Sequence, residues 1–316
     1  MTSKQPTYIE DYQTSAAFNN GSRLVYGTSG LGGVWGEVVQ RDSVDALLYA
    51  FEQGISVIDT APSYANAQKY VGLALQEWQG ERPFISTKVG RLRADDAHTT
   101  ITDYTPEGLK RSFYSSLEIL GVDRVDLLFL HEPQLVPLAH MQEILETLQV
   151  FKSDGLCDLI GVGGNPTAAF MPYITKANFD VVSGFLHLDA CNLSALDKQI
   201  PSFQKEGVAY YAASALHFSL LGNRFEQYAH QTPDEWISEA DQAAAKAVKQ
   251  LADAHDMPLA SLAQRYLFSI AEADRVVMGA RTPAQIQATV ADWKAGKLPE
   301  RIFQAVTSAI IAARKA

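Results

Sequence analysis

The chain alternates short apolar runs with longer segments in which apolar residues recur every three or four positions. The short runs predict buried β-strands, and the longer segments predict helices with one apolar face. The runs that read as strands are Leu24–Gly27, Val57–Asp59, Phe84–Lys88, Val125–His131, Leu159–Val162, Val181–Leu186, Val208–Ala213 and Val276–Met278. Strands that alternate with helices favour a parallel sheet, so the pattern predicts an α/β fold built as a single (β/α)8 TIM barrel.

The helical periods lie between these strands and continue after the last one. They cover Asp42–Gln53, Ala67–Trp78, Pro106–Leu120, Met141–Asp154, part of Ser194–Glu206, Ala240–Ala254, Pro258–Ile270, a segment opened by Thr282-Pro283, and part of Leu298–Ala313. The last of these is an extra C-terminal helix. Residues 214–236 show no clear period, which is typical of a functional loop. We expect residues 1–20 to form an N-terminal arm and residues 21–316 to form the single barrel domain.

Residues with useful chemistry stand at the ends of three successive predicted strands. Asp59 closes the second strand and Tyr64 lies on the turn after it, while Lys88 closes the third strand and His131 the fourth. Each residue alone has an ordinary explanation, as a turn residue, a packed ring, a solvated charge or a structural histidine. In a parallel barrel, however, the carboxyl ends of all strands share one face. The four side chains are therefore predicted to converge there as a catalytic group.

The composition is typical of a globular protein and argues against several classes of partner. The chain has 316 residues, of which 47% are hydrophobic and 20% charged, as in ordinary globular proteins. A formal net charge of −10 argues against nucleic-acid and anionic-membrane partners. Cys157 and Cys191 lack metal-ligand spacing, so we expect reduced thiols and no bound metal. We see no apolar leader and no run of the roughly 20 apolar residues that span a membrane, so a cytoplasmic protein is expected.

A glycine-rich segment, Thr28–Gly33, follows the first predicted strand. Its spacing differs from the dinucleotide-binding fingerprint, and no strong strand–helix pattern surrounds it. Because glycine tolerates positive φ, a flexible turn at the barrel rim explains the segment without any ligand.

The order of these motifs resembles the aldo-keto reductase family over nearly the whole chain. The match rests on an Asp-Thr-Ala-x-x-Tyr motif that begins at Asp59, on the strand-end Lys88 and on the strand-end His131. The resemblance implies that Asp59, Tyr64, Lys88 and His131 form the catalytic tetrad of an NAD(P)-dependent oxidoreductase. Tyr64 would act as general acid and base, with its pKa lowered by Lys88. Asp59 would hold Lys88, and His131 would orient the substrate oxygen.

The resemblance also implies which residues contact the cofactor. They are Gly30, Leu31, Asp59, Asn165, Ser214, Leu216, Gly279, Arg281 and Gln285. The family's usual Ser-Asn pair after the fifth strand is replaced by Gly-Gly-Asn ending at Asn165, which leaves one polar contact unmatched. Many NADP-using members carry Lys at the position of Gly279 and Arg at that of Gln285, so the absence of both favours NAD. Arg281 keeps NADP open, unless it is an ordinary solvated charge.

Within the family, the resemblance is to the aldose 1-dehydrogenase / L-galactose dehydrogenase branch. It rests on the segments 33–36, 180–182 with His187, and 213–221. The branch implies oxidation of the anomeric hydroxyl of a free aldose, of the L-galactose, L-fucose or D-arabinose type, to its lactone. The implied substrate contacts are Val34, Trp35, Tyr64, His131 and His187. His187 is equally explained as a structural histidine, and the residue that stacks on the nicotinamide is either His187 or Phe185.

Two departures from the family and two other functions stay open. Ala65 replaces the glycine that usually follows the tyrosine of the motif, and Ala67-Gln68 replaces a Ser-Glu pair. An NADPH-dependent aldehyde or ketone reductase would use the same tetrad. A nicotinamide-binding regulatory subunit without catalysis is the third possibility, although an intact tetrad counts against it. The expected partner is a small-molecule sugar or aldehyde, and the family's usual state is a monomer or weak homo-oligomer.

Overall fold

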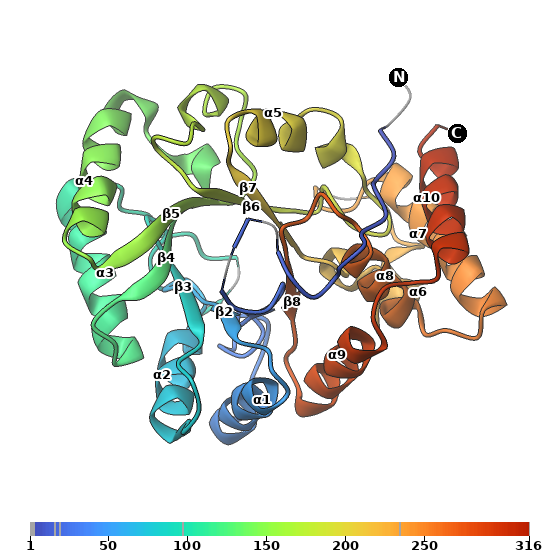
Figure 1. Cartoon of the computed structure of the whole chain (residues 1–316), viewed down its shortest axis with the longest axis horizontal. Coiled ribbons are helices and arrows are strands. Elements are labelled where there is room, and N and C mark those ends of the chain that lie inside the picture. The colour runs from blue at the N-terminus through green and yellow to red at the C-terminus, as the bar shows by residue number, and fades with distance from the viewer. Residues whose placement is uncertain (1–3, 16, 19, 97, 234, 316) are drawn as a thin grey trace.

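The computed structural model describes residues 4–15, 17–18, 20–96, 98–233 and 235–315. Within these residues, eight parallel strands form a closed barrel in chain order, with β8 paired to β1 (Figure 1). The strands are β1 (Leu24–Gly27), β2 (Val57–Asp59), β3 (Phe84–Val89), β4 (Val125–His131), β5 (Cys157–Gly163), β6 (Val181–Phe185), β7 (Ala209–Ala213) and β8 (Arg275–Gly279). The predicted (β/α)8 TIM barrel is confirmed.

Helices form an outer layer around the barrel (Figure 1). They are α1 (Gln40–Glu52), α2 (Ala67–Glu77), α3 (Pro106–Leu120), α4 (Met141–Ser153), α5 (Gln199–Lys205), α6 (Phe225–Tyr228), α7 (Glu239–Ala254), α8 (Leu259–Phe268), α9 (Pro283–Ala295) and α10 (Glu300–Ala313). The predicted extra C-terminal helix is α10, which packs against α7. No helix in the described ranges is both long and apolar enough to cross a membrane.

Local sequence signals start and stop α3 as expected. The Thr105 side chain accepts a hydrogen bond from the backbone N–H of Gly108 at 3.1 Å, and Pro106 and Glu107 fill the first turn. Gly121 ends the helix in the left-handed conformation, at φ 67°, which a residue without Cβ adopts at little cost. The bounds of α3 therefore follow from its own sequence as well as from packing.

Three connections differ from a regular alternation of strand and helix. Between β5 and β6, the residues 164–180 form a 3-10 turn, Met171–Tyr173, and no α-helix. The segment 194–206 is split into a 3-10 turn and the short α5, and the connection 214–236 contains the 3-10 turn His217–Ser219 and the short α6. In 164–180, Pro166 and Pro172 lack the backbone N–H that a continuous helix needs.

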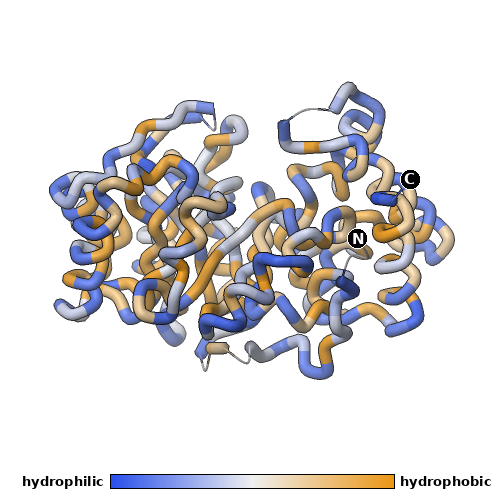
Figure 2. The backbone as a smooth tube through the Cα atoms, turned by 90° about the horizontal axis from the view of Figure 1, so that it is seen from above, coloured by the Kyte–Doolittle hydropathy of each residue, from blue (hydrophilic) through white to orange (hydrophobic). Residues whose placement is uncertain are grey.

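Strand residues alternate between two hydrophobic layers. Val57 and Phe129 face the inside of the barrel, whereas their neighbours Ile58 and Leu128 pack outward against the helices. In Figure 2, hydrophobic and hydrophilic stretches alternate along the outer helices, as expected when one helix face rests on the barrel. The period of two along each strand therefore decides which side chains reach the interior.

The N-terminal end of the barrel is closed by a cluster of rings around one cation. Arg275, buried at the start of β8, lies 4.5 Å from the ring centroid of Phe18 and 4.4 Å from that of Phe84. Its Nη1 also donates to the Tyr211 hydroxyl at 2.7 Å. The segment before β1, dark blue in Figure 1, crosses this end of the barrel. Residues 1–3, 16 and 19 of the predicted arm lie outside the described residues, and the division into arm and domain stays a prediction.

Candidate active site

Three of the predicted catalytic residues lie at the carboxyl ends of neighbouring strands and on their inward-facing side. Asp59 stands two positions after the inward-facing Val57, and His131 two positions after Phe129. Lys88 stands four positions after the inward-facing first residue of β3. Asp59, Lys88 and His131 are 7%, 4% and 6% exposed. The strand period thus places three polar side chains directly above the apolar interior.

Asp59 and Lys88 form a buried ion pair. The Lys88 Nζ donates to both carboxylate oxygens of Asp59 at 2.6 Å and to the Thr60 carbonyl at 3.0 Å. The Ser86 hydroxyl donates to Asp59 Oδ1 at 2.8 Å. Because all three N–H groups of the ammonium have acceptors, the position of Lys88 is fixed by its neighbours.

Tyr64 lies on the loop after β2 and reaches over this ion pair. The Lys88 Nζ is 5.0 Å from the centroid of the Tyr64 ring. The same ring meets that of His131 edge-on, with the centroids 6.1 Å apart. Tyr64 is half-buried, so its side chain borders both the protein interior and the barrel mouth. The structure therefore brings the four predicted residues into one cluster, and their catalytic roles stay predictions.

His131 is held by residues that the sequence did not single out. The Tyr104 hydroxyl donates to the His131 carbonyl at 2.8 Å. Glu132, at φ 56°, pairs with Arg91 at 2.8 Å and places its carboxylate 4.0 Å from His131 Nε2. His131 Nδ1 is buried without a hydrogen-bond partner in the described part of the chain. Arg91 and Tyr104 come from the segment between β3 and α3, and only a search for polar residues near that strand end could have found them.

Burial and neighbouring charges change the protonation of Lys88 and His131. Burial lowers the pKa of Lys88, although Asp59 and Glu132 act in the opposite direction. Burial also lowers the pKa of His131 well below its usual value, and the cations Lys88 and Arg91 add to this effect. His131 is therefore a neutral imidazole at neutral pH, with one ring N–H donor and one acceptor.

The net pKa of Tyr64 in this structure is raised, not lowered as predicted. Burial raises the pKa of Tyr64 well above its usual value, and the carboxylates of Asp59 and Glu132 raise it further, against the opposing charge of Arg91. The charge of Lys88, which is paired with Asp59 at 2.6 Å, does not outweigh these effects. Tyr64 is accordingly a phenol and a proton donor at neutral pH.

The loops after β1 and β8 meet at the same rim. A Cβ added to Gly30 would lie 3.3 Å from Arg281 Cβ, so the two loops are in close contact. The Arg281 guanidinium is exposed but donates to the Trp35 carbonyl at 3.0 Å, so it is more than a solvated charge. Gln285 Oε1 accepts from the backbone N–H of Arg281 at 2.8 Å and caps α9. Gly279, at the end of β8, is exposed beside them.

Leu31 and Val34, which were expected near the ligands, belong to the buried part of the first loop. Leu31 is 0% exposed, and its N–H donates to the Thr28 carbonyl at 3.0 Å. Its carbonyl accepts from the Ser43 hydroxyl at 3.2 Å. Val34 is 7% exposed. Both side chains therefore pack under the rim, and their contacts with a ligand stay predictions.

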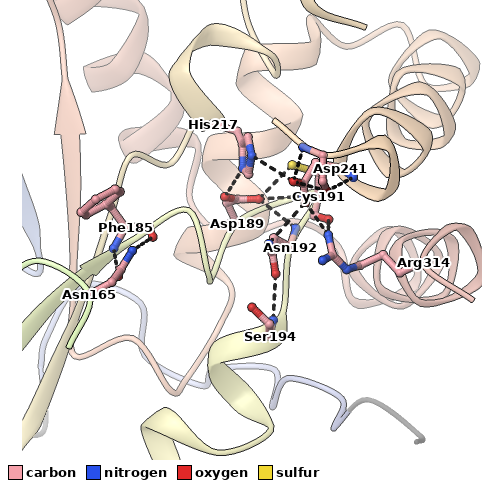
Figure 3. A network of polar contacts seen from close by, with 10 residues as sticks. Asn165, Phe185, Asp189, Cys191, Asn192, Ser194, His217, Asp241 and Arg314 are labelled. Atoms are coloured by element: carbon pink, nitrogen blue, oxygen red, sulfur yellow. Dashed lines mark hydrogen bonds and ion pairs between the residues drawn. The ribbon is translucent and has the colours of Figure 1, made fainter. Parts of the chain in front are cut away.

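Asn165 and Phe185 join the ends of β5 and β6 (Figure 3). The Asn165 Nδ2 donates to the Phe185 carbonyl at 2.9 Å, and its Oδ1 accepts from the Phe185 N–H at 3.0 Å. The amide predicted to contact the nicotinamide thus also fixes the backbone beside the half-buried Phe185 ring. His187 Nδ1 lies 3.3 Å from Gln199 Oε1 on α5, a contact that fits its explanation as a structural histidine.

Four rings form what we call the aromatic wall: Trp35, Phe185, Phe218 and Trp236. The ring centroid of Phe218 lies 6.0 Å from that of Trp35, 6.5 Å from that of Phe185 and 5.5 Å from that of Trp236. Trp35 and Trp236 are each 48% exposed. Sequence reasoning did not assign Phe218 or Trp236, because the aperiodic connection after β7 gives no sign of which residues face the barrel mouth.

Ser214 and Leu216 begin this same connection, and both are half-buried. Ser214 has a φ of 58°, and its carbonyl accepts from the His217 N–H at 2.8 Å. The predicted cofactor residues therefore stand on the connections after β1, β5, β7 and β8. All four connections leave the carboxyl ends of their strands, the end that also carries the tetrad.

The sequence profile of the aldo/keto reductase family matches residues 23–311. The chain belongs to this family. As an aldo/keto reductase, it is an NAD(P)-dependent oxidoreductase of small molecules. The buried unpartnered nitrogen of His131, the phenol of Tyr64 and the fixed cation of Lys88 form a donor set that fits hydride exchange with a carbonyl group beside a nicotinamide.

Named relatives of this aldo/keto reductase include two sugar dehydrogenases. L-galactose dehydrogenase of Arabidopsis thaliana is 29% identical over 280 residues, which cover 85% of this chain and 83% of the relative. D-threo-aldose 1-dehydrogenase of a Pseudomonas species is 26% identical over 312 residues, which cover 90% of this chain and 93% of the relative. The solved glycerol dehydrogenase of Gluconobacter oxydans superposes with a TM-score of 0.75 at 22% identity, over 99% of this chain and 97% of that one. This last likeness concerns the fold alone.

Proposed function

We propose that this aldo/keto reductase oxidises the anomeric hydroxyl of a free aldose to a lactone, with NAD as the preferred cofactor. The observation that carries the proposal is the placement of Tyr64 over the Asp59–Lys88 pair, with the ring of His131 beside it. The two sugar dehydrogenases among the relatives support the aldose as the substrate class.

The residues have distinct tasks in this reaction. Tyr64, as phenolate, takes the proton of the anomeric hydroxyl, and His131 donates a hydrogen bond to the same oxygen. A nicotinamide held beside them would supply the acceptor for the hydride of C1, and loss of that hydride would leave the carbonyl of the lactone. Lys88 stabilises the charge on Tyr64, and Asp59 keeps Lys88 in position. Asn165, Ser214, Leu216, Gly279 and Arg281 would hold the cofactor, on the connections described above.

The aromatic wall supports a sugar as substrate. Trp35 and Trp236 offer exposed rings at the mouth, and such faces pack well against the C–H groups of a pyranose. His131 and Tyr64 supply the polar contacts at the reacting oxygen. The wall is assembled from the connections after β1 and β7 and from the end of β6, so its shape would select among aldoses that differ at one hydroxyl.

A second candidate is reduction of aldehydes or ketones by NADPH. It is favoured by the raised pKa of Tyr64, because a phenol is the form that donates a proton to a carbonyl. Arg281 also provides a cation for a 2′-phosphate. The two candidates use the same tetrad and differ in cofactor and direction.

The deciding experiment follows the absorbance of the reduced nicotinamide at 340 nm. NAD and NADP are each tested with L-galactose, L-fucose, D-arabinose and D-glucose, and NADPH and NADH with simple aldehydes. Signal with an aldose and NAD, together with a lactone trapped as its hydroxamate, supports the proposal. Consumption of NADPH by aldehydes with a silent sugar panel selects the reductase. Tight nucleotide binding without any turnover would indicate a regulatory subunit instead.

Two matched variants separate chemistry from folding in this assay. Tyr64→Phe removes the reacting hydroxyl, and Tyr114→Phe removes the hydroxyl of a tyrosine that is 52% exposed on α3. We expect the first to lose turnover and the second to keep it. Equal turnover in both would refute the assignment of Tyr64.

A further inference from the structure

A second cluster of charged side chains lies outside the tetrad and is buried (Figure 3). It joins Asp189 after β6, His217 after β7, Asp241 on α7 and Arg314 after α10. The His217 Nδ1 lies 2.7 Å from Asp189 Oδ2, and its Nε2 lies 3.7 Å from Asp241 Oδ2. Arg314 Nη1 lies 2.5 Å from Asp241 Oδ1 and 3.0 Å from the Cys191 carbonyl. We call these four side chains the anchor cluster.

The positive and negative charges of the anchor cluster cancel only when the His217 imidazole carries a second proton. Burial alone lowers the pKa of His217, but Cys191, Asp189 and Asp241 outweigh it and hold the pKa well above its usual value. Cys191 is itself a thiol, because burial raises its pKa, so the two carboxylates carry this effect. Burial acts to raise the pKa of Asp241, yet the nearby imidazole of His217 and the hydrogen bond from Ser238 lower it overall. Two carboxylates thus face one imidazolium and one guanidinium.

Direct hydrogen bonds hold the Asp189 carboxylate. Asp189 Oδ1 accepts from the backbone N–H groups of Cys191 and Asn192 at 2.8 and 2.9 Å and from Cys191 Sγ at 3.2 Å. Its Oδ2 takes the His217 hydrogen bond. These hydrogen bonds hold both oxygens of the Asp189 carboxylate in place.

His217 stands in the most strained stretch of the described chain. Ser214, His217, Phe218 and Ser219 have φ values of 58°, 47°, 50° and 76°. Residues with a Cβ keep such values only where their surroundings hold them there. The buried side chain of His217, fixed between Asp189 and Asp241, is the strongest such constraint in this stretch.

The strained stretch carries two parts of the proposed active site. Ser214 and Leu216 lie three and one residues before His217, and Phe218 of the aromatic wall follows it directly. We propose that the anchor cluster is a positioning device for the nucleotide: it holds the segment 214–218 in its binding conformation through the charge of His217. This inference rests on the proposed role of Ser214 and Leu216 at the cofactor.

Because the pKa of His217 is raised, nucleotide affinity should depend on pH. The contribution of the cluster is complete below the ordinary pKa of about 6.5 and is lost as the pH rises through the elevated value of the folded protein. Nucleotide affinity should therefore fall on the alkaline side. The groups that face His217 are Asp189 and Cys191 from the connection after β6 and Asp241 from α7, with Arg314 behind Asp241.

The test compares His217→Gln with His255→Gln, which changes a half-buried histidine just after the other end of α7. We measure the Kd of NAD and NADP by quenching of tryptophan fluorescence, kcat at saturating nucleotide, and amide hydrogen exchange of residues 214–222. In His217→Gln we expect a Kd about tenfold higher, as when one-tenth of the molecules hold a competent segment. Exchange in 214–222 should be faster, kcat should stay within about twofold, and the alkaline rise in Kd should vanish. His255→Gln should match the native protein.

Arg314→Met is the second variant, should His217→Gln fail to fold. It removes a half-buried cation at the edge of the cluster, and we expect the same changes with a smaller rise in Kd.

Unchanged Kd and unchanged exchange in the folded variants would overturn the inference while leaving the proposed function intact. Faster exchange with unchanged Kd would overturn the link between this segment and the nucleotide. Stoichiometric metal in the purified protein would also overturn it. A native protein that binds no nucleotide would instead refute the proposed function.

Discussion

The two ends of the barrel interior each hold one buried cation, in opposite surroundings. At the N-terminal end, Arg275 lies between aromatic rings and is covered by the segment before β1. At the carboxyl end, Lys88 is bound by a carboxylate, and the half-buried Tyr64 and the unpartnered Nδ1 of His131 stand next to it. The first cation is enclosed by groups that do not titrate near neutral pH. The second lies beside Tyr64 and His131, whose pKa values are shifted.

The surroundings of Arg275 suit a structural role, whereas those of Lys88 suit catalysis. Rings stabilise a guanidinium and close the barrel without leaving any group to react. A carboxylate that fixes an ammonium leaves the adjacent phenol and imidazole free to exchange protons with a ligand. Substitutions at the two ends should therefore separate stability from activity.

The largest effect on turnover is expected at the carboxyl end of the barrel, which is the open end. Lys88→Met should lower kcat by about 1,000-fold, because Tyr64 loses the cation that stabilises its phenolate. It also leaves Asp59 buried without its counter-ion, so the free energy of unfolding should fall as well. Steady-state kinetics and urea unfolding measure the two effects. Lys69→Met, on the exposed face of α2, is the control, and turnover that survives Lys88→Met would remove Lys88 from the mechanism.

The next effect, on stability, is expected at the N-terminal end of the barrel, which the aromatic rings close. Arg275→Met should lower the free energy of unfolding by about 2–3 kcal/mol, because a hydrogen bond and ring contacts are lost together. kcat of the folded enzyme should stay unchanged. The matched control is Arg41→Met, whose side chain is 53% exposed. Loss of its exposed ion pairs should change the free energy of unfolding much less. A large loss of kcat in folded Arg275→Met would contradict the separation of the two ends.

The raised pKa of Tyr64 predicts the pH dependence of the open end. Oxidation needs the phenolate, so its kcat should rise up to about tenfold per pH unit until the pH reaches the raised value. Reduction uses the phenol and should show no such rise. Rates in both directions at constant ionic strength test this prediction. A flat oxidation profile between neutral and alkaline pH would speak against Tyr64 as the base.

The smallest effect concerns a third cation, on the open rim. Arg281 is exposed and donates to the Trp35 carbonyl. Arg281→Gln should raise the Kd of NADP about fivefold relative to that of NAD, because a charge-assisted contact with a 2′-phosphate is lost. Competition titrations of both nucleotides measure the ratio. An equal change for NAD and NADP would show that Arg281 acts only by joining the two loops.

The barrel and the cluster of four residues could be predicted because their signals are local. A period of two places Asp59, Lys88 and His131 on inward-facing positions once the strands are recognised. The aromatic wall could not be predicted, since Phe218 and Trp236 meet only after an aperiodic connection has folded. The raised pKa of Tyr64 was missed for a similar reason: it depends on burial and on the competition of Asp59 for Lys88, and neither is visible in the order of the residues.

Contacts between the two ends of the chain constrain the order of events during synthesis. Thr7 donates to the Glu272 carboxylate, Arg23 binds the Ala273 carbonyl at 3.0 Å, and β1 pairs with β8. A ribosome releases the partners of the first strand last, so the barrel cannot close until nearly all of the chain has emerged. Until then the edges of β1 and of the growing sheet stay exposed. Slowing translation near the end of the message should therefore prolong a state that depends on chaperones.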